Sequence, residues 1–134
     1  MATGNAPVQP ELRARKLWLA IGWALVLLVI YLSLAPAPVE IPVEEGDKFG
    51  HVLAYAALMV WFASVYEQRG KRALFAIGFV MMGIALEFAQ RETGYRTFEV
   101  ADMIADAIGV IGGWLLAPPR MPNCLQRMEK LLWG

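Results

Sequence analysis

The sequence predicts an all-α membrane protein: a four-transmembrane-helix bundle with a short C-terminal interfacial helix. Hydrophobic residues make up 58% of the 134 residues and charged residues only 18%, which is atypical of soluble domains and of disordered chains. The hydrophobic residues fall into blocks separated by short polar segments, each block being about as long as a membrane-crossing helix. We therefore expect a cytoplasmic tail over residues 1–16, a transmembrane domain over 17–117, and a cytoplasmic tail with an amphipathic helix over 118–134.

The first hydrophobic block, residues 17–34, contains no charged residue and directly follows a basic segment. A cleaved signal peptide is the alternative, because Ala35 and Ala37 form an A-x-A pattern of the kind that precedes a cleavage site. The block is longer than a usual signal-peptide core, and Pro38 would follow the cut. Both features favour a transmembrane helix.

The remaining hydrophobic blocks cover residues 49–66, 73–89 and 100–117. The last block ends at Pro118 and Pro119, because proline lacks the amide hydrogen that a continuing helix needs. Beyond it, Asn123 is expected to cap a short helix with one apolar face, which is typical of a helix lying in the membrane interface. The apolar face is formed by Leu125, Met128 and Leu132.

Lys and Arg are distributed unevenly among the polar flanks of the blocks. They gather before the first block, between the second and third, and after the fourth, whereas the other two connections are acidic or balanced. Basic flanks are retained in the cytoplasm, so both termini are expected there and the chain is expected to be a multi-pass protein of the cytoplasmic (inner) membrane. The basic flanks contain Arg13, Arg15, Lys16, Arg69, Lys71, Arg72, Arg120, Arg127 and Lys130.

Charge and cysteine content narrow the classes of partner. The formal net charge is zero, so the sequence offers no basic surface for nucleic acid, and membrane lipids are the expected partners.

Cys124 is the single cysteine, which excludes an internal disulfide. The chain has one His, no HExxH motif and no paired-His spacing, so no metal and no cofactor are expected. Oligomeric state is left open.

Polar residues recur at helical spacing near one end of the second, third and fourth blocks. Ionisable groups inside a membrane are costly, so they usually face the bundle interior and mark function. At about 1.5 Å of rise per residue, Asp106 lies roughly 9 Å below Val100, which places the group in a recess below the outer surface. The recess is expected to contain Asp47, His51, Tyr55, Glu87, Gln90, Arg96, Asp102 and Asp106.

The fourth block also carries small residues at four-residue spacing. Such a stripe allows another helix to approach closely, and the same packing would draw the adjacent Asp102 and Asp106 toward the interior. The stripe consists of Ala101, Ala105, Gly109 and Gly113.

The order and spacing of these polar and small residues resemble the VanZ-like family of small bacterial membrane proteins, over roughly residues 17–116. The family is named for a member linked to teicoplanin resistance. The resemblance therefore implies an antibiotic resistance-related membrane protein that works near cell-envelope precursors at the outer face. This chain has Asp106 where an Asn is expected. The residues that carry the resemblance are Asp47, Lys48, His51, Tyr55, Glu87, Gln90, Arg96, Asp102, Asp106, Gly109 and Gly113.

The first functional hypothesis is a site that binds or processes a lipid-linked envelope head group. The catalytic candidates are His51 as proton partner and Glu87 or Asp102 as base, with His51 or Arg96 expected to pair with Glu87. Whether a reaction takes place is left open. The expected ligand-binding residues are Asp47, Tyr55, Gln90, Arg96 and Asp106.

Two other functions compete with this one. A scaffold or accessory subunit would use the same polar cluster to fix helix register, and His51 would then be an imidazole held by Asp47 and a neighbouring carboxylate. Ion-coupled transport is less favoured, because the inner half of the bundle has no ionisable residues. Lys48 is interpreted as an interfacial residue whose stem lies along the apolar surface.

Overall fold

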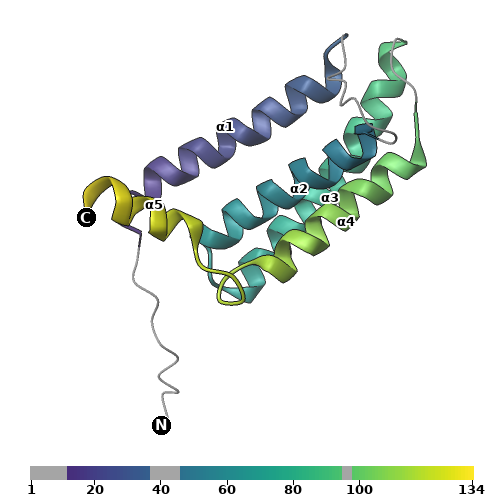
Figure 1. The fold of residues 1–134 in the computed structure, drawn as a ribbon. Helices are drawn as coiled ribbons and strands as arrows, with labels where there is room; N and C mark the ends of the chain where they lie inside the picture. The colour runs from purple at the N-terminus through teal and green to yellow at the C-terminus, as the bar shows by residue number, and fades with distance from the viewer. Residues whose placement is uncertain (1–11, 37–45, 95–97) are drawn as a thin grey trace.

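The computed structural model describes residues 12–36, 46–94 and 98–134, without the side chains of residues 46 and 47. The secondary structure of this part is entirely helical. Four long helices lie side by side and a short fifth helix lies across one end (Figure 1). The helices are α1 (Arg15–Leu34), α2 (Gly46–Val65), α3 (Arg69–Thr93), α4 (Val100–Leu116) and α5 (Cys124–Trp133).

The all-helical class is confirmed, and three of the helices in the described part are long and apolar enough to cross a membrane. These are α1, the Lys48–Val65 part of α2, and α3. The fourth expected span is not confirmed. Helix α4 has 17 residues, or about 26 Å of length, against a hydrocarbon core of about 30 Å.

Helix α3 extends beyond the hydrophobic block from which it was predicted. The third block was expected to span residues 73–89, whereas α3 runs from Arg69 to Thr93. The backbone hydrogen bonds of a helix form whether the side chains are apolar or charged, so α3 continues through the charged residues at both of its ends. It stops at Gly94, whose φ of 77° is the left-handed conformation that commonly ends a helix and that glycine adopts without strain.

Helix α4 packs closely against α2 through its small residues. A Cβ on Gly109 would lie 2.5 Å from the carbonyl oxygen of Val52, and one on Gly113 would lie 2.7 Å from that of Ala56. The predicted stripe of small residues is therefore confirmed at Gly109 and Gly113, while Ala101 is exposed. This contact builds the core, which on the α2 side consists mainly of Tyr55, Leu58, Met59, Phe62 and Ala63.

Helix α1 contacts α2 and α3 along a narrower stripe. Trp18, Gly22 and Val26 are its buried residues, at four-residue spacing. A Cβ on Gly22 would lie 2.9 Å from both Trp61 and Phe62, so the glycine admits these rings. Trp61 Nε1 also donates to the carbonyl oxygen of Trp18 at 2.8 Å, which fixes α1 against α2.

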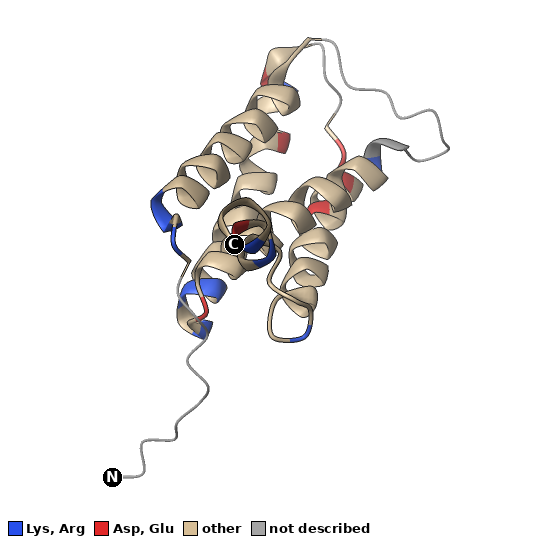
Figure 2. Cartoon of the chain, turned by 60° about the vertical axis from the view of Figure 1, so that its left-hand side comes forward, with Lys and Arg blue, Asp and Glu red and all other residues tan. Residues whose placement is uncertain are grey.

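The two ends of the bundle differ in the charged residues that they carry (Figure 2). The basic end holds the starts of α1 and α3, the ends of α2 and α4, and α5; the acidic end holds the opposite ends of the long helices. At the basic end, the Arg72 guanidinium donates to the carbonyl oxygens of Ala63, Tyr66 and Pro118 at 2.7, 2.8 and 2.7 Å. Arg72 thereby joins the end of α2 to the segment that follows α4.

The outward faces of the long helices are apolar. Large aliphatic and aromatic side chains stay exposed along α1, α3 and α4, which is unfavourable in water and expected against lipid. Among these exposed residues are Leu27, Leu28, Tyr31, Leu74, Ile77, Met81, Ile104, Ile108, Ile111 and Leu115.

Helix α5 is fixed to the bundle by polar contacts at its first and second turns. As predicted, Asn123 caps it: its side-chain oxygen accepts from the backbone N–H groups of Leu125 and Gln126 at 3.0 and 3.2 Å. Its amide nitrogen donates to the carbonyl oxygen of Ser64 at 2.8 Å. Of the expected apolar face, Leu125 is fully buried, whereas Met128 and Leu132 are exposed.

Glu129 joins α5 to the start of α1. Its carboxylate accepts from the backbone N–H groups of Arg13 and Ala14 at 2.8 and 2.7 Å, and from Trp18 Nε1 at 2.7 Å. Burial alone would raise the pKa of this carboxyl group, but these hydrogen bonds and the charge of Arg13 outweigh burial and lower the pKa. The carboxylate therefore occupies the positive end of the α1 dipole, where a negative charge is stabilised.

Candidate functional site

The candidate site is a half-buried imidazole with two buried carboxylates at the acidic end, which we call the His51 cluster: His51, Asp102 and Asp106. His51 Nδ1 lies 2.7 Å from Asp106 Oδ1, and His51 Nε2 lies 4.0 Å from Asp102 Oδ2. The side chain of Asp106 is 3% exposed and that of Asp102 is 10% exposed, whereas His51 is 21% exposed. The imidazole is therefore the member of the cluster that a molecule outside the bundle reaches first.

The positions of these residues follow from the helix packing. His51 lies in the second turn of α2, and both aspartates lie in the first two turns of α4. The close α2–α4 contact brings the two faces together. Gly83 of α3 makes room for Asp106, because a Cβ there would lie 2.6 Å from Asp106 Oδ2. The cluster thus depends on three helices.

An ionised Asp106 fixes the tautomer of His51. The carboxylate accepts a hydrogen bond from Nδ1–H, so a neutral imidazole carries its lone pair on Nε2. Nε2 faces Asp102 at a distance longer than a hydrogen bond. This arrangement can bind a proton or accept a hydrogen bond from a hydroxyl or amine at Nε2.

Glu87 lies in the same part of the fold but has a different partner from the expected one. Its Oε1 accepts from the backbone N–H of Glu99 at 2.6 Å, at the residue that directly precedes α4. The expected bond to His51 is not formed. A carboxylate beside a helix N-terminus satisfies an unpaired amide and stabilises the helix dipole, so Glu87 positions α4.

Tyr55 is buried between α2 and α4, one turn beyond His51, and packs against Gly109. Gln90 is buried too, and its Nε2 donates to the carbonyl oxygen of Ser33 at 2.7 Å, so it holds the end of α1. Lys48 was expected to lie along the apolar surface, but its Nζ is paired with Glu99 Oε2 at 3.1 Å. Both partners of this ion pair are partly exposed.

Two of the expected ligand-binding groups, the side chain of Asp47 and residue Arg96, lie outside the described part of the chain. No group of three or more His, Cys, Asp or Glu residues in the described part is arranged to hold a metal ion. The described residues of the site carry more carboxylates than cations. They suit a ligand that supplies hydrogen-bond donors or positive charge.

Sequence reasoning missed two positioning residues. Glu99 provides both the amide that binds Glu87 and the carboxylate that binds Lys48. Gly83 provides the space for Asp106. A signal for Gly83 was present, because Gly83, Glu87 and Gln90 share one face of α3 at four- and three-residue spacing.

Comparisons with known proteins give one relative and no family. The chain is 34% identical to a Schizosaccharomyces pombe protein described as uncharacterized protein C11E3.10, in an alignment 99 residues long that covers 71% of this chain. The chain spans 59% of that protein's length. No family model matches the chain. No solved structure matches it.

These findings correct the predicted membership of the VanZ-like family of small bacterial membrane proteins. A relative from a eukaryote argues against a bacterial family, and no family model supports the resemblance. The expectations of a role in the cell envelope, a link to antibiotic resistance and a place in the bacterial inner membrane rested on that resemblance and lose their support with it.

Proposed function

We propose that the chain crosses a membrane four times, with the basic end on the cytoplasmic side. Three of its helices meet the length and apolarity of a span. The outward face of α4 is apolar as well, with Ile104, Ile108 and Ile111 exposed. The alternation of basic and acidic connections favours the same topology, because Lys and Arg are retained in the cytoplasm.

Labelling with a membrane-impermeant thiol reagent tests this topology. Cys124 is exposed at the basic end and is expected to react only after the membrane is opened. In a Cys124→Ser background, Glu44→Cys and Thr93→Cys are expected to react in intact cells, because residue 44 belongs to the connection between α1 and α2 and Thr93 is the last residue of α3, which ends at the acidic end. Labelling of Cys124 from outside intact cells would contradict the proposal.

We further propose that the His51 cluster binds, and exchanges a proton with, the polar head group of a lipid-linked molecule presented at the acidic end. The observation that carries this proposal is the 2.7 Å contact between His51 Nδ1 and Asp106 Oδ1. This contact directs the basic Nε2 of a partly exposed imidazole toward a second carboxylate. An oriented imidazole of this kind is common at sites of proton transfer.

The charge of the site favours a head group with hydroxyl or amine donors. Asp102, Asp106 and Glu87 supply negative charge in a buried setting, and in the described part Lys48 is already paired with Glu99. Sugar hydroxyls and amines donate to carboxylates and to a neutral imidazole. Asp106 would orient His51, and His51 and Asp102 would contact the ligand.

Complementation of a deletion strain with single variants tests this function. His51→Ala and Glu87→Gln are each expected to abolish complementation while the amount of protein in membranes stays near the wild-type level. Loss of a positioned acid or base lowers a proton-transfer rate by roughly 10²-fold or more. Glu87→Gln keeps an oxygen that can accept from the Glu99 amide, so it tests the charge of residue 87 and not the cap.

Lys48→Gln is the matched control, because Lys48 is a charged residue of the same end whose ion pair is partly exposed. It is expected to complement, since exposed pairs contribute about 0–1 kcal/mol. Full complementation by His51→Ala would remove the cluster from the function, and full complementation by Glu87→Gln would show that the charge of Glu87 is not needed.

A scaffold is the second candidate function, and the contacts of Asp106 favour it. Asp106 touches both His51 of α2 and the backbone at Gly83 of α3, so the cluster also fixes how three helices pack. Under this alternative, membrane abundance falls in step with complementation in His51→Ala. Quantitative immunoblots of the same strains separate the two functions.

A further inference from the structure

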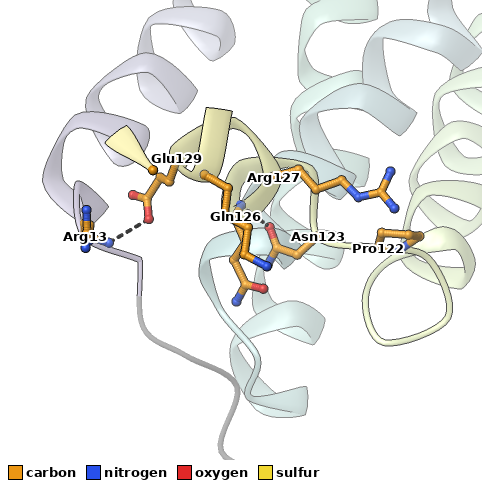
Figure 3. Close-up of a pocket in the computed structure, with 8 residues that line it drawn as sticks. Arg13, Pro122, Asn123, Gln126, Arg127 and Glu129 are labelled. Carbon is orange, nitrogen blue, oxygen red and sulfur yellow. Dashed lines mark hydrogen bonds between the residues drawn. The ribbon is translucent and has the colours of Figure 1, made fainter. Parts of the chain in front are cut away.

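A groove of about 470 Å³ lies at the basic end, between α5 and the start of α1 (Figure 3). It is far from the His51 cluster, which lies at the acidic end. Most of the residues that line it have polar side chains, among them Arg13, Asn123, Gln126, Arg127, Glu129 and Lys130. A ligand in this groove would therefore be separate from one at the His51 cluster.

The contacts of Glu129 and Asn123 keep this groove in shape. Glu129 binds the first amides of α1, and Asn123 binds both the start of α5 and the carbonyl oxygen of Ser64. Each is buried, with 7% of its surface exposed. The Glu129 carboxylate faces α1, where three hydrogen-bond donors stabilise its charge. Glu129 and Asn123 thus hold the wall of the groove in place, and the Glu129 carboxylate already accepts hydrogen bonds from α1.

The remaining charge in the lining is positive. Arg127 and Lys130 are exposed and form no ion pair with any described residue. Arg13 lies over the last turn of α5, where its Nη1 is 3.5 Å from the carbonyl oxygen of Trp133. Arg13 lies at one end of the groove beside Glu129, and the Arg127 side chain extends away from it, toward Pro122 (Figure 3). An anion beside Arg127 and Lys130 would meet two cations that pair with no described residue.

The apolar side of α5 lies beside this basic side. At about 100° per residue, Lys130 and Arg127 fall on one flank of the helix and Met128, Leu131 and Leu132 on the other. All of these apolar side chains are exposed, Leu131 to 87%. A helix with basic and apolar flanks lies in the membrane interface, where its cations meet lipid phosphates and its apolar residues meet acyl chains.

We propose that α5 and the start of α1 form a binding site for an anionic glycerophospholipid. The lipid phosphate lies at the groove beside Arg127 and Lys130. The acyl chains extend along the flank formed by Met128, Leu131 and Leu132. The site is independent of the function proposed for the His51 cluster and of which leaflet the basic end faces.

Native mass spectrometry of the full chain released from nanodiscs tests this site. The nanodiscs contain phosphatidylcholine with a minor fraction of phosphatidylglycerol, and the measured quantity is the apparent affinity for phosphatidylglycerol. The Arg127→Gln/Lys130→Gln variant is expected to bind about 25-fold more weakly, because each Lys or Arg near a surface contributes about fivefold. Both side chains are exposed and unpaired among the described residues, so the fold is expected to persist.

The matched control is Arg69→Gln/Arg120→Gln, which removes the same charge from the same end but outside the groove. It is expected to bind phosphatidylglycerol like the wild type. Equal weakening in both double variants would show diffuse attraction to the basic end and would overturn the proposal. An unchanged affinity in the first variant would overturn it too, as would displacement of the lipid by excess inorganic phosphate, which would identify a site for the free anion.

Discussion

Gly109→Ala is expected to lower the free energy of unfolding by about 1–3 kcal/mol, because the added methyl group overlaps α2. The Cβ would lie 2.5 Å from the carbonyl oxygen of Val52 and 3.1 Å from Tyr55 Cβ. A backbone oxygen inside a helix cannot turn away as the end of a flexible side chain can, so the whole of α2 must shift. Unfolding of the purified chain by sodium dodecyl sulfate, followed by tryptophan fluorescence, measures the change.

Gly112→Ala is the control for this substitution. Gly112 is on the same helix, but a Cβ there meets nothing within 4 Å. Alanine is favoured over glycine inside a helix by about 1 kcal/mol, so this variant is expected to be as stable as the wild type or slightly more stable. If both alanines destabilised the protein equally, the contact between α4 and α2 would not be the cause.

These two glycines illustrate how far the sequence predicts the packing. Four-residue spacing correctly identified the face of α4 that approaches another helix, because that spacing places small residues on one stripe. The partner helix could not be identified. Val52 and Ala56 of α2 contribute backbone oxygens to the contact, and every residue carries such an oxygen. The pairing of α4 with α2 is therefore a property of the folded bundle.

The candidate site was predicted in part for a similar reason. Helical spacing placed His51, Asp102 and Asp106 at one depth, and the structure brings them into contact. Glu87 was assigned a side-chain partner, but it binds the backbone amide of Glu99. Backbone donors are unmarked in a sequence, so helix caps formed between distant segments escape pattern analysis.

The prediction that the chain belongs to the VanZ-like family was wrong for a related reason. Polar residues near the ends of spans and small residues at helix contacts are required by the physics of any membrane bundle. Chains of different families therefore share them. The pattern of polar residues from His51 to Asp106 indicates a helical bundle with a buried polar cluster. It does not identify the family to which the chain belongs.

Glu129→Gln is expected to release α5 from the bundle at neutral pH. On an amphipathic helix a Glu is expected in solvent, yet here the carboxylate accepts three hydrogen bonds at the start of α1. The amide has one acceptor oxygen and brings an NH₂ group against donors, so about 2–4 kcal/mol of docking free energy is lost. Trypsin measures release, because Arg127 and Lys130 lie within α5 and a docked helix resists cleavage.

Glu67→Gln is the control for this variant, since Glu67 is an exposed carboxylate of the same end. Its cleavage rate is expected to match that of the wild type. Rapid cleavage at Arg127 in both variants would mean that loss of any negative charge at the basic end loosens α5, and the specific role of Glu129 would be wrong.

The docking of α5 against the bundle is also expected to weaken as the pH falls, because it depends on the charge of Glu129. Hydrogen bonds hold the pKa of the docked carboxyl group below its ordinary value, so the charged form favours docking. The contribution is complete above the ordinary carboxyl pKa of about 4.3 and is lost as the pH falls through the lowered value. Hydrogen exchange over Cys124–Trp133 should therefore accelerate, beyond its intrinsic pH dependence, only at a pH below the ordinary carboxyl pKa. In Glu129→Gln, α5 should exchange rapidly throughout, and an acid-induced release retained in that variant would assign the titration to another group.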